Sequence, residues 1–212
     1  MSETPDLTKL YEAILTGDAN AARETTEAAL EAGVPPQELV AEQMIPAMDE
    51  VGKRFECNEY FVPELLIAAR AMKSALDLLR PLLAELGIEP VGRVVIGTVK
   101  GDLHDIGKGL VASMLEGGGF EVVDLGVDVT AEQFIAKAQE CKANIIALSA
   151  LLTTTMTAMK AVIETAKEAD LDCKIMVGGA PVTQQYADSI GADGYSNNAS
   201  GAVALARELS AA

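Results

Sequence analysis

The chain has 212 residues, of which 50% are hydrophobic and 4% aromatic, and its formal net charge is −16. This length fits one large domain or two small ones with a real apolar core, and no apolar run approaches the roughly 18–20 residues of a membrane span. The acidic balance and the absence of Trp argue against nucleic acid as the main partner, because phosphate binding needs a basic face.

The N-terminal stretch and the cysteines indicate the compartment. MSETPDLTKLYEAIL is acidic and lacks the basic-then-apolar pattern of a secretory signal. Cys57, Cys141 and Cys173 are odd in number and widely spaced, which favours reduced thiols over a disulfide framework. We therefore expect a soluble, cytoplasmic protein with no membrane partner.

Residues 1–88 contain no convincing β run. Apolar residues recur at helical spacing in four stretches, 8–15, 21–32, 36–55 and 63–86. Gly17-Asp18, the run from Gly33 to Pro36, and Cys57-Asn58-Glu59 separate these stretches. The pattern predicts four or five helices in a small bundle.

The segment 87–90, GIEP, indicates a linker, after which short apolar runs alternate with helical stretches. The runs predict strands at 93–99, 120–126, 144–150, 173–179 and 193–196. Helices are expected at about 107–117, 131–142, 156–169, 184–190 and 198–210. Apolar strands separated by helices indicate a parallel sheet covered on both faces. The predicted fold is an N-terminal helical bundle (1–88) followed by a doubly wound α/β domain with a five-stranded parallel sheet (89–212).

Unusual residues gather where the predicted strands end. KGDLHDIG (100–107) follows the first strand and contains His104, the single histidine of the chain. SALLTTT (149–155), GGAP (178–181) and YSNNA (195–199) follow the third, fourth and fifth strands. Because ligands of doubly wound sheets bind outside the carboxyl ends of the strands, these loops predict one wide pocket.

Three chemistries fit this pocket poorly. Residues 107–112 match G-x-G-x-x-A, but a dinucleotide fingerprint needs its first Gly in the turn right after the strand, and about seven residues intervene here. Zinc held by Asp102, His104 and Asp105 would lack the His or Cys ligands that dominate such sites. Ser149 could take His104 as a base, but it is not on a G-x-S-x-G elbow.

Two interpretations of His104 remain. A lone histidine is often a structural residue bonded to a carboxylate, and Asp102 lies two positions away. Alternatively, His104 binds a metal brought by a cofactor, with Asp102 accepting its second N–H as ligating histidines usually require. A single protein ligand suffices only when a macrocycle fills the other metal positions, which narrows the field to haem or a corrinoid.

The three spaced motifs D-x-H-x-x-G (102–107), S-x-L (149–151) and G-G (178–179) resemble the signature of cobalamin-binding domains. VGKRFECNEYFVPELLIAARAMK (51–73) is similar to the cap helices of methyl-carrying corrinoid proteins and of cobalamin-dependent methionine synthase. The resemblance covers nearly the whole chain. One departure is Asn58, which stands where the family often has Gly in a turn; Asn also tolerates left-handed backbone, so we expect the turn to survive.

The resemblance implies roles for individual residues. His104 would replace dimethylbenzimidazole as the lower cobalt ligand, the base-off/His-on mode. Asp102 would accept a hydrogen bond from the imidazole, and Thr155 would complete this relay. Phe55 and Val62 would cover the upper, methyl-bearing face of the cofactor. The remaining residues expected at the cofactor or its nucleotide tail are Gly101, Leu103, Asp105, Gly107, Ser149, Leu151, Thr153, Gly178, Gly179 and Ala199.

The function implied by the resemblance is that of a carrier subunit without catalytic residues of its own, in an anaerobic methyltransferase system. Its cofactor would be cobalamin or a related corrinoid. Its partners would be a substrate-specific methyltransferase, a second methyltransferase acting on tetrahydrofolate or coenzyme M, and a reductive activating protein. The alternatives are a cobalamin-sensing regulatory protein or the small subunit of a cobalamin-dependent mutase. The sequence does not name the methyl donor, the acceptor, the native lower base of the corrinoid or the oligomeric state.

Overall fold

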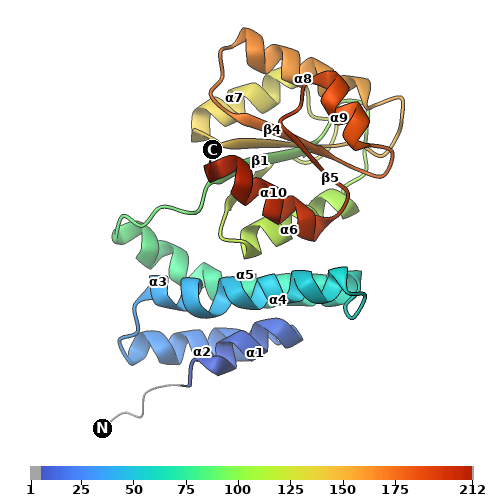
Figure 1. The fold of residues 1–212 in the computed structure, drawn as a ribbon. Coiled ribbons are helices and arrows are strands. Elements are labelled where there is room, and N and C mark those ends of the chain that lie inside the picture. The colour runs from blue at the N-terminus through green and yellow to red at the C-terminus, as the bar shows by residue number, and fades with distance from the viewer. Residues whose placement is uncertain (1–5, 212) are drawn as a thin grey trace. The chain divides into compact units, whose positions relative to one another are not determined.

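The structure is a computed structural model and describes residues 6–211. It divides into two compact units, one comprising residues up to Pro90 together with Glu116–Gly119, the other Val91–Leu115 together with the chain from Phe120 on. Figure 1 shows the helical N-terminal part and the sheet of the C-terminal part. No helix among the described residues is long and apolar enough to cross a membrane.

The N-terminal unit is built from helices. Leu10, Leu39, Met72 and Leu79 are among the fully or almost fully buried side chains that form its apolar core. Its turn chemistry follows the sequence signals, since Gly17 ends the first helix with a left-handed backbone (φ 78°). The elements are α1 (Thr8–Thr16), α2 (Ala19–Glu31), α3 (Pro36–Leu39), the π-helix η1 (Val40–Met44), α4 (Ile45–Glu56) and α5 (Val62–Glu85).

The stretch 36–55, predicted as one helix, contains the π-helical segment η1. At its end the Ile45 N–H donates to the Val40 carbonyl, five residues back rather than four. The next residue, Pro46, has no N–H to continue the α-helical pattern, which accounts for the wider turn. Asn58, in the turn between α4 and α5, adopts φ 59°, so the turn survives without the glycine expected from the resemblance.

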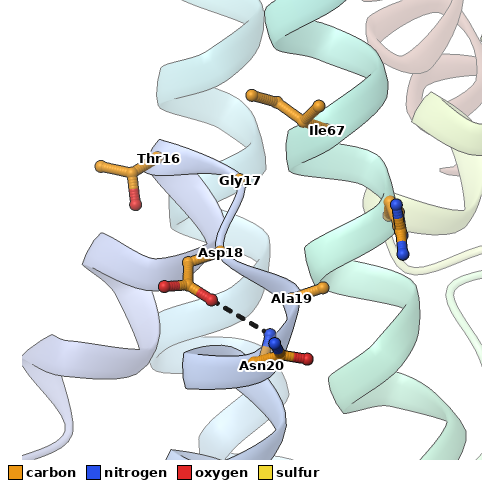
Figure 2. Close-up of a pocket in the computed structure, with 7 residues that line it drawn as sticks. Thr16, Gly17, Asp18, Ala19, Asn20 and Ile67 are labelled. Atoms are coloured by element: carbon orange, nitrogen blue, oxygen red, sulfur yellow. Dashed lines mark hydrogen bonds between the residues drawn. The ribbon is translucent and has the colours of Figure 1, made fainter.

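A pocket of about 420 Å³ lies beside the turn between α1 and α2 and is lined by residues 16–20 with Ile67 and Arg70 of α5. Figure 2 shows the labelled residues of this lining. The Asp18 carboxylate accepts hydrogen bonds from the N–H groups of Asn20 and Ala21, as an N-cap of α2 does. The Asp18 carboxylate is therefore occupied in capping α2. None of the predicted site residues lines the pocket.

The C-terminal unit is a five-stranded parallel sheet with the order β2-β1-β3-β4-β5 (Figure 1). The predicted doubly wound α/β fold is confirmed. Its strands are β1 (Arg93–Thr98), β2 (Glu121–Asp124), β3 (Ile145–Ser149), β4 (Lys174–Gly178) and β5 (Gly194–Ser196). Its helices are α6 (Ile106–Gly117), α7 (Ala131–Cys141), α8 (Thr157–Glu168), α9 (Gln184–Ile190) and α10 (Ala199–Ala211).

The strand order reverses between β1 and β3, since β1 lies between β2 and β3. Helices α7 and α8 lie on one face of the sheet and α6 and α10 on the other (Figure 1). The loops that follow β1 and β3 therefore lead to helices on opposite faces, and in doubly wound sheets this is the part of the carboxyl edge where ligands bind. The histidine loop lies at this part of the edge.

Close packing of α7 on the sheet depends on Gly97 in β1. Phe134 of α7 is fully buried, and a Cβ atom at position 97 would lie 2.7 Å from its Cζ atom. Valine or isoleucine, which occupy the three positions before Gly97 in β1, would collide with this ring. The glycine is thus a packing requirement, although it is unfavourable to an isolated strand.

We expect Gly97→Ala to lower the free energy of unfolding by about 1–3 kcal/mol, the usual cost of overpacking a core. Gly109→Ala in α6 is the matched control, because a Cβ atom there would meet nothing within 4 Å. Alanine favours a helix by about 1 kcal/mol over glycine, so this second change is expected to stabilise. Urea unfolding followed by circular dichroism checks both, and shifts of the same sign would contradict the packing argument.

Candidate functional site

The histidine loop begins with a tight turn at the end of β1. The Asp102 N–H donates to the Val99 carbonyl at 3.1 Å, and Gly101, the third residue of the turn, has φ 84°. Turns with a left-handed third residue favour Gly there, which explains the K-G-D sequence. The turn sends the chain back across the edge of the sheet, so that residues 102–105 lie between β1 and α6.

The side chains of Asp102 and His104 form a hydrogen bond in this loop. The Asp102 carboxylate is buried, and its Oδ1 atom lies 2.7 Å from Nδ1 of His104. An ionised carboxylate only accepts hydrogen bonds, so Nδ1 must carry the proton. The neutral ring then has its lone pair on Nε2, which is the nitrogen available to a metal.

The Asp102 carboxylate accepts hydrogen bonds from other donors in addition to the imidazole. Its Oδ2 atom accepts from the Thr155 hydroxyl at 2.6 Å and from the backbone N–H groups of Leu151 and Leu152 at 2.8 and 3.3 Å. Burial opposes ionisation, but the hydrogen bonds from Thr155, His104 and Leu151 outweigh it and hold the pKa of the Asp102 carboxyl well below its usual range. The carboxylate therefore stays charged and links the loops after β1 and β3.

Ser149, the last residue of β3, lies on the other side of the ring. Its Oγ atom is 2.9 Å from Nε2 of His104. Because Nε2 has no proton in the tautomer that Asp102 fixes, the serine hydroxyl donates and the imidazole accepts. Both ring nitrogens of His104 are thus held, one by a carboxylate and one by a neutral hydroxyl.

Thr98 is a site residue that the sequence analysis did not predict. It is fully buried at the end of β1, and its hydroxyl donates to the backbone carbonyl of His104 at 2.7 Å. The register of the sheet pairs Thr98 with Ser149, so both hydroxyls point at the same loop. The only signal in the sequence is a polar residue that directly follows the apolar run VVIG (94–97).

The two predicted glycines at the end of β4, Gly178 and Gly179, lie where the backbones of neighbouring segments come close together. Gly179 has φ 123°, and a Cβ atom there would lie 1.9 Å from the Ala150 carbonyl oxygen. A Cβ atom on Gly178 would be 3.2 Å from the carbonyl oxygen of Ser196. The loop after β4 therefore approaches Ala150 closely only because residue 179 has no side chain. Ala199 is the buried first residue of α10.

Several apolar side chains near the histidine loop are exposed. Leu103 is 75% exposed and Ile106 83%, and Leu151 and Leu152 in the loop after β3 are about half exposed. Large apolar residues exposed around one polar group indicate a surface that a ligand covers. The remaining predicted residues of this unit are exposed as well, Asp105 and Thr153 in these two loops and Gly107 in the first turn of α6.

Phe55 and Val62 belong to the N-terminal unit. Phe55 lies in the last turn of α4 and is half-buried, and Val62 is the first residue of α5 and is 41% exposed. The structure joins Asp102, His104 and Ser149 to Thr155 and the Leu151 amide by direct hydrogen bonds. It does not join Phe55 or Val62 to that network by any such bond.

The donor set of the site suits a metal that arrives with most of its ligands. His104 offers one imidazole nitrogen, and within residues 6–211 no three His, Cys, Asp or Glu side chains group as a metal site. The apolar, exposed surroundings suit a flat macrocycle better than a hydrated ion. The residues present therefore fit a corrinoid.

Comparison with known proteins decides the family. A family model described as a B12 binding domain matches residues 92–204, and a second model of that description matches residues 7–80. The chain belongs to the cobalamin-binding corrinoid proteins. The resemblance noted in the sequence and the expected corrinoid cofactor are thereby confirmed.

Named relatives of this corrinoid protein are similar over most or nearly all of their length. Trimethylamine corrinoid protein 1 of Methanosarcina acetivorans is 46% identical, and the match covers 96% of each chain. Dimethylamine corrinoid protein 1 of the same organism is 44% identical over 99% of each chain. A chain of the methanol:cobalamin methyltransferase complex of Methanosarcina barkeri is 30% identical with a TM-score of 0.87, covering 97% of this chain and 79% of that one.

Replacing Asp102 by Asn tests the electrostatic part of this site. An amide NH₂ would face the donors that now meet Oδ2, leaving buried N–H or O–H groups unpaired, so Asp102→Asn is expected to destabilise by about 2 kcal/mol at pH 7. Because the pKa of Asp102 is lowered on folding, its carboxylate stabilises the fold above the unfolded value of about 4. That contribution declines as the pH falls below this value.

The difference in unfolding free energy between wild type and Asp102→Asn should therefore shrink as the pH is lowered from about 5 towards about 3. Urea unfolding at several pH values measures it. Asp172→Asn, an exposed aspartate of the same unit, is the control and should change stability by less than about 0.5 kcal/mol. A difference independent of pH would show that the charge of Asp102 is not what stabilises the loop.

Proposed function

We propose that this corrinoid protein carries a methyl group between two methyltransferases, with cobalamin bound base-off and His104 as the lower cobalt ligand. The observation that carries the proposal is the hydrogen-bond chain Thr155–Asp102–His104. It fixes the tautomer of the only histidine so that the lone pair is on Nε2. This is the arrangement that ligating histidines use with their second-shell carboxylates.

Bound cobalamin would supply a cobalt ion that accepts a methyl group from one substrate and passes it to another. The chain's own contribution would be to hold the ligand and to store a proton. In the absence of a metal bond, Nε2 of His104 would be able to take up a proton. The proton would stay on the imidazole and not on Asp102, because the lowered pKa of Asp102 keeps the carboxylate ionised. An ionised Asp102 then stabilises the imidazolium across the 2.7 Å contact.

Other loop residues would bind the remainder of the cofactor. Leu103 and Leu151 are exposed and apolar, which suits contact with the macrocycle. Residues proposed to line the slot for the nucleotide tail are Gly101, Asp105, Gly107, Ser149, Thr153, Gly178, Gly179 and Ala199. Phe55 and Val62 are proposed to meet the opposite, methyl-bearing face of the cofactor.

The relatives support partnership with methyltransferases, since one similar chain comes from a methanol:cobalamin methyltransferase complex. We propose a first methyltransferase specific for the methyl donor, a second acting on tetrahydrofolate or coenzyme M, and a reductive activating protein. The donors named for the relatives are trimethylamine, dimethylamine and methanol, and these are the first to test. The charge of −16 would favour partners with basic docking surfaces.

The test is to mix the untagged chain with hydroxocobalamin, remove free cofactor, and record absorption spectra of wild type and His104→Ala. Wild type should retain one corrinoid per chain and show imidazole ligation, and the variant should lose that ligation. The chain is informative here because it has one histidine, so no second imidazole can take its place. Circular dichroism of the variant shows whether it is folded.

The control is Asp170→Ala, a change in an exposed residue after α8, which should leave retention and spectrum as in wild type. Retention by wild type without imidazole ligation, or ligation that persists in folded His104→Ala, would contradict the His-on mode. Transfer is then tested by supplying the reduced, loaded chain with methyltransferases of the relatives and isotope-labelled donors. Failure of every donor and methyltransferase to label the corrinoid would contradict the carrier role.

A further inference from the structure

Four residues other than Gly have a positive φ among residues 6–211, and one of them has no helix end to explain it. Lys142 is the C-terminal cap of α7, Asp170 follows the end of α8, and Asn58 follows the end of α4. A left-handed residue is usual at such positions. Asp128, with φ 56°, lies in the loop between β2 and α7. Strained backbone away from a helix end persists where surrounding contacts hold it, often near a functional site.

The contacts of Asp128 reach the turn that begins the histidine loop. Its Oδ1 atom accepts the Gly101 N–H at 2.7 Å, and its own backbone N–H donates to the Asp102 carbonyl at 3.0 Å. The left-handed backbone lets the carboxylate and the N–H of Asp128 bind two successive residues of the turn, Gly101 and Asp102. Val129, which follows, continues the contact by donating to the Thr98 carbonyl at 3.0 Å.

A second contact, from the end of β2, holds the chain that follows the histidine loop. Lys108, in the first turn of α6, is 4% exposed and its ammonium contacts the carboxylate of Asp124 at the end of β2. Asp124 also accepts the Gly126 N–H at 2.8 Å. Two contacts from the end of β2 onwards therefore hold the histidine loop: Asp128 holds the chain before His104, and Asp124 holds Lys108 after it.

We propose that Asp128 is a positioning residue for the His104 ligand, acting through the backbone of Gly101 and Asp102. Asp102 can orient the imidazole only if its own backbone is fixed, and Asp128 fixes it from the loop after β2. This inference rests on the proposed role of His104 as the cobalt ligand. It adds a residue that has no hydrogen bond to the imidazole, acts through backbone atoms of the histidine loop and lies 24 positions from His104 in the sequence.

Three variants separate the two features of Asp128. Asp128→Asn keeps an acceptor oxygen and tolerates a left-handed backbone, so it should behave as wild type. Asp128→Gly keeps the backbone freedom but loses the acceptor, and Asp128→Ala loses both. Asp170→Ala is the matched control, because it removes another left-handed aspartate (φ 47°) with no hydrogen bond to the histidine loop.

The first readout needs no corrinoid. Long-range ¹H–¹⁵N correlation spectra of the untagged chain report which nitrogen of its single histidine carries the proton, at a pH where the ring is neutral. Wild type, Asp128→Asn and Asp170→Ala should show one form, protonated on Nδ1. Asp128→Gly and Asp128→Ala should show a mixture of the two tautomers, because the carboxylate of Asp102 is no longer held in register with the ring.

The second readout uses the hydroxocobalamin-loaded chain. The ratio of histidine-ligated to histidine-free corrinoid should fall on the order of five-fold in Asp128→Gly and Asp128→Ala, the effect of about one net hydrogen bond. It should change less than about two-fold in Asp128→Asn and Asp170→Ala. If Asp128→Ala does not fold, Asp128→Gly carries the test, because glycine adopts the left-handed backbone without strain.

Unchanged tautomer and ligation in Asp128→Gly, or equal changes in Asp170→Ala, would overturn the proposal and leave Asp128 a residue of stability only. These outcomes differ from failure of the proposed function. If wild type retains no corrinoid, the carrier role fails, whereas the tautomer of His104 in the unloaded chain still decides whether Asp128 positions the ring.

Discussion

The candidate site depends on one buried carboxylate. The charge of Asp102 is stabilised by hydrogen bonds from the Thr155 hydroxyl, the Leu151 and Leu152 amides and the imidazole that it orients. Leaving such a charge with fewer donors would cost several kcal/mol, so the loops after β1 and β3 must close together around it. The tautomer of His104, the turn at Gly101 and the position of Ser149 all follow from this closure.

Much of the fold follows from local pattern. The strands β1 and β3 contain the continuous apolar runs 94–97 and 145–148, and runs of that kind between turn signals have few alternatives to a buried parallel sheet. The histidine loop could be located because it follows such a run. The corrinoid cofactor came from the three spaced motifs and not from the physical chemistry of any one residue.

What the sequence did not reveal depends on register and on backbone conformation. Thr98 meets the His104 carbonyl because β1 and β3 pair so that Thr98 lies opposite Ser149, and no pattern within either strand reports that pairing. Asp128 acts through a left-handed backbone that aspartate adopts only in particular surroundings. The π-helix at residues 40–44 depends on Pro46 within a strongly helical stretch, where helical periodicity alone predicts a regular helix.

With His104 in its proposed role as the cobalt ligand, the hydroxyl of Ser149 on Nε2 would affect how selectively the chain acquires its metal. An imidazole with a bare lone pair in an exposed loop would attract any free copper or zinc ion, for which nitrogen donors have high affinity. Because the serine hydroxyl already donates to that lone pair, any incoming metal would have to break this hydrogen bond before it could bind Nε2. A bare ion gains a single ligand from that exchange, whereas a macrocyclic complex also gains the apolar surface around Leu103 and Leu151, so discrimination against simple ions is built into the ground state of the loop.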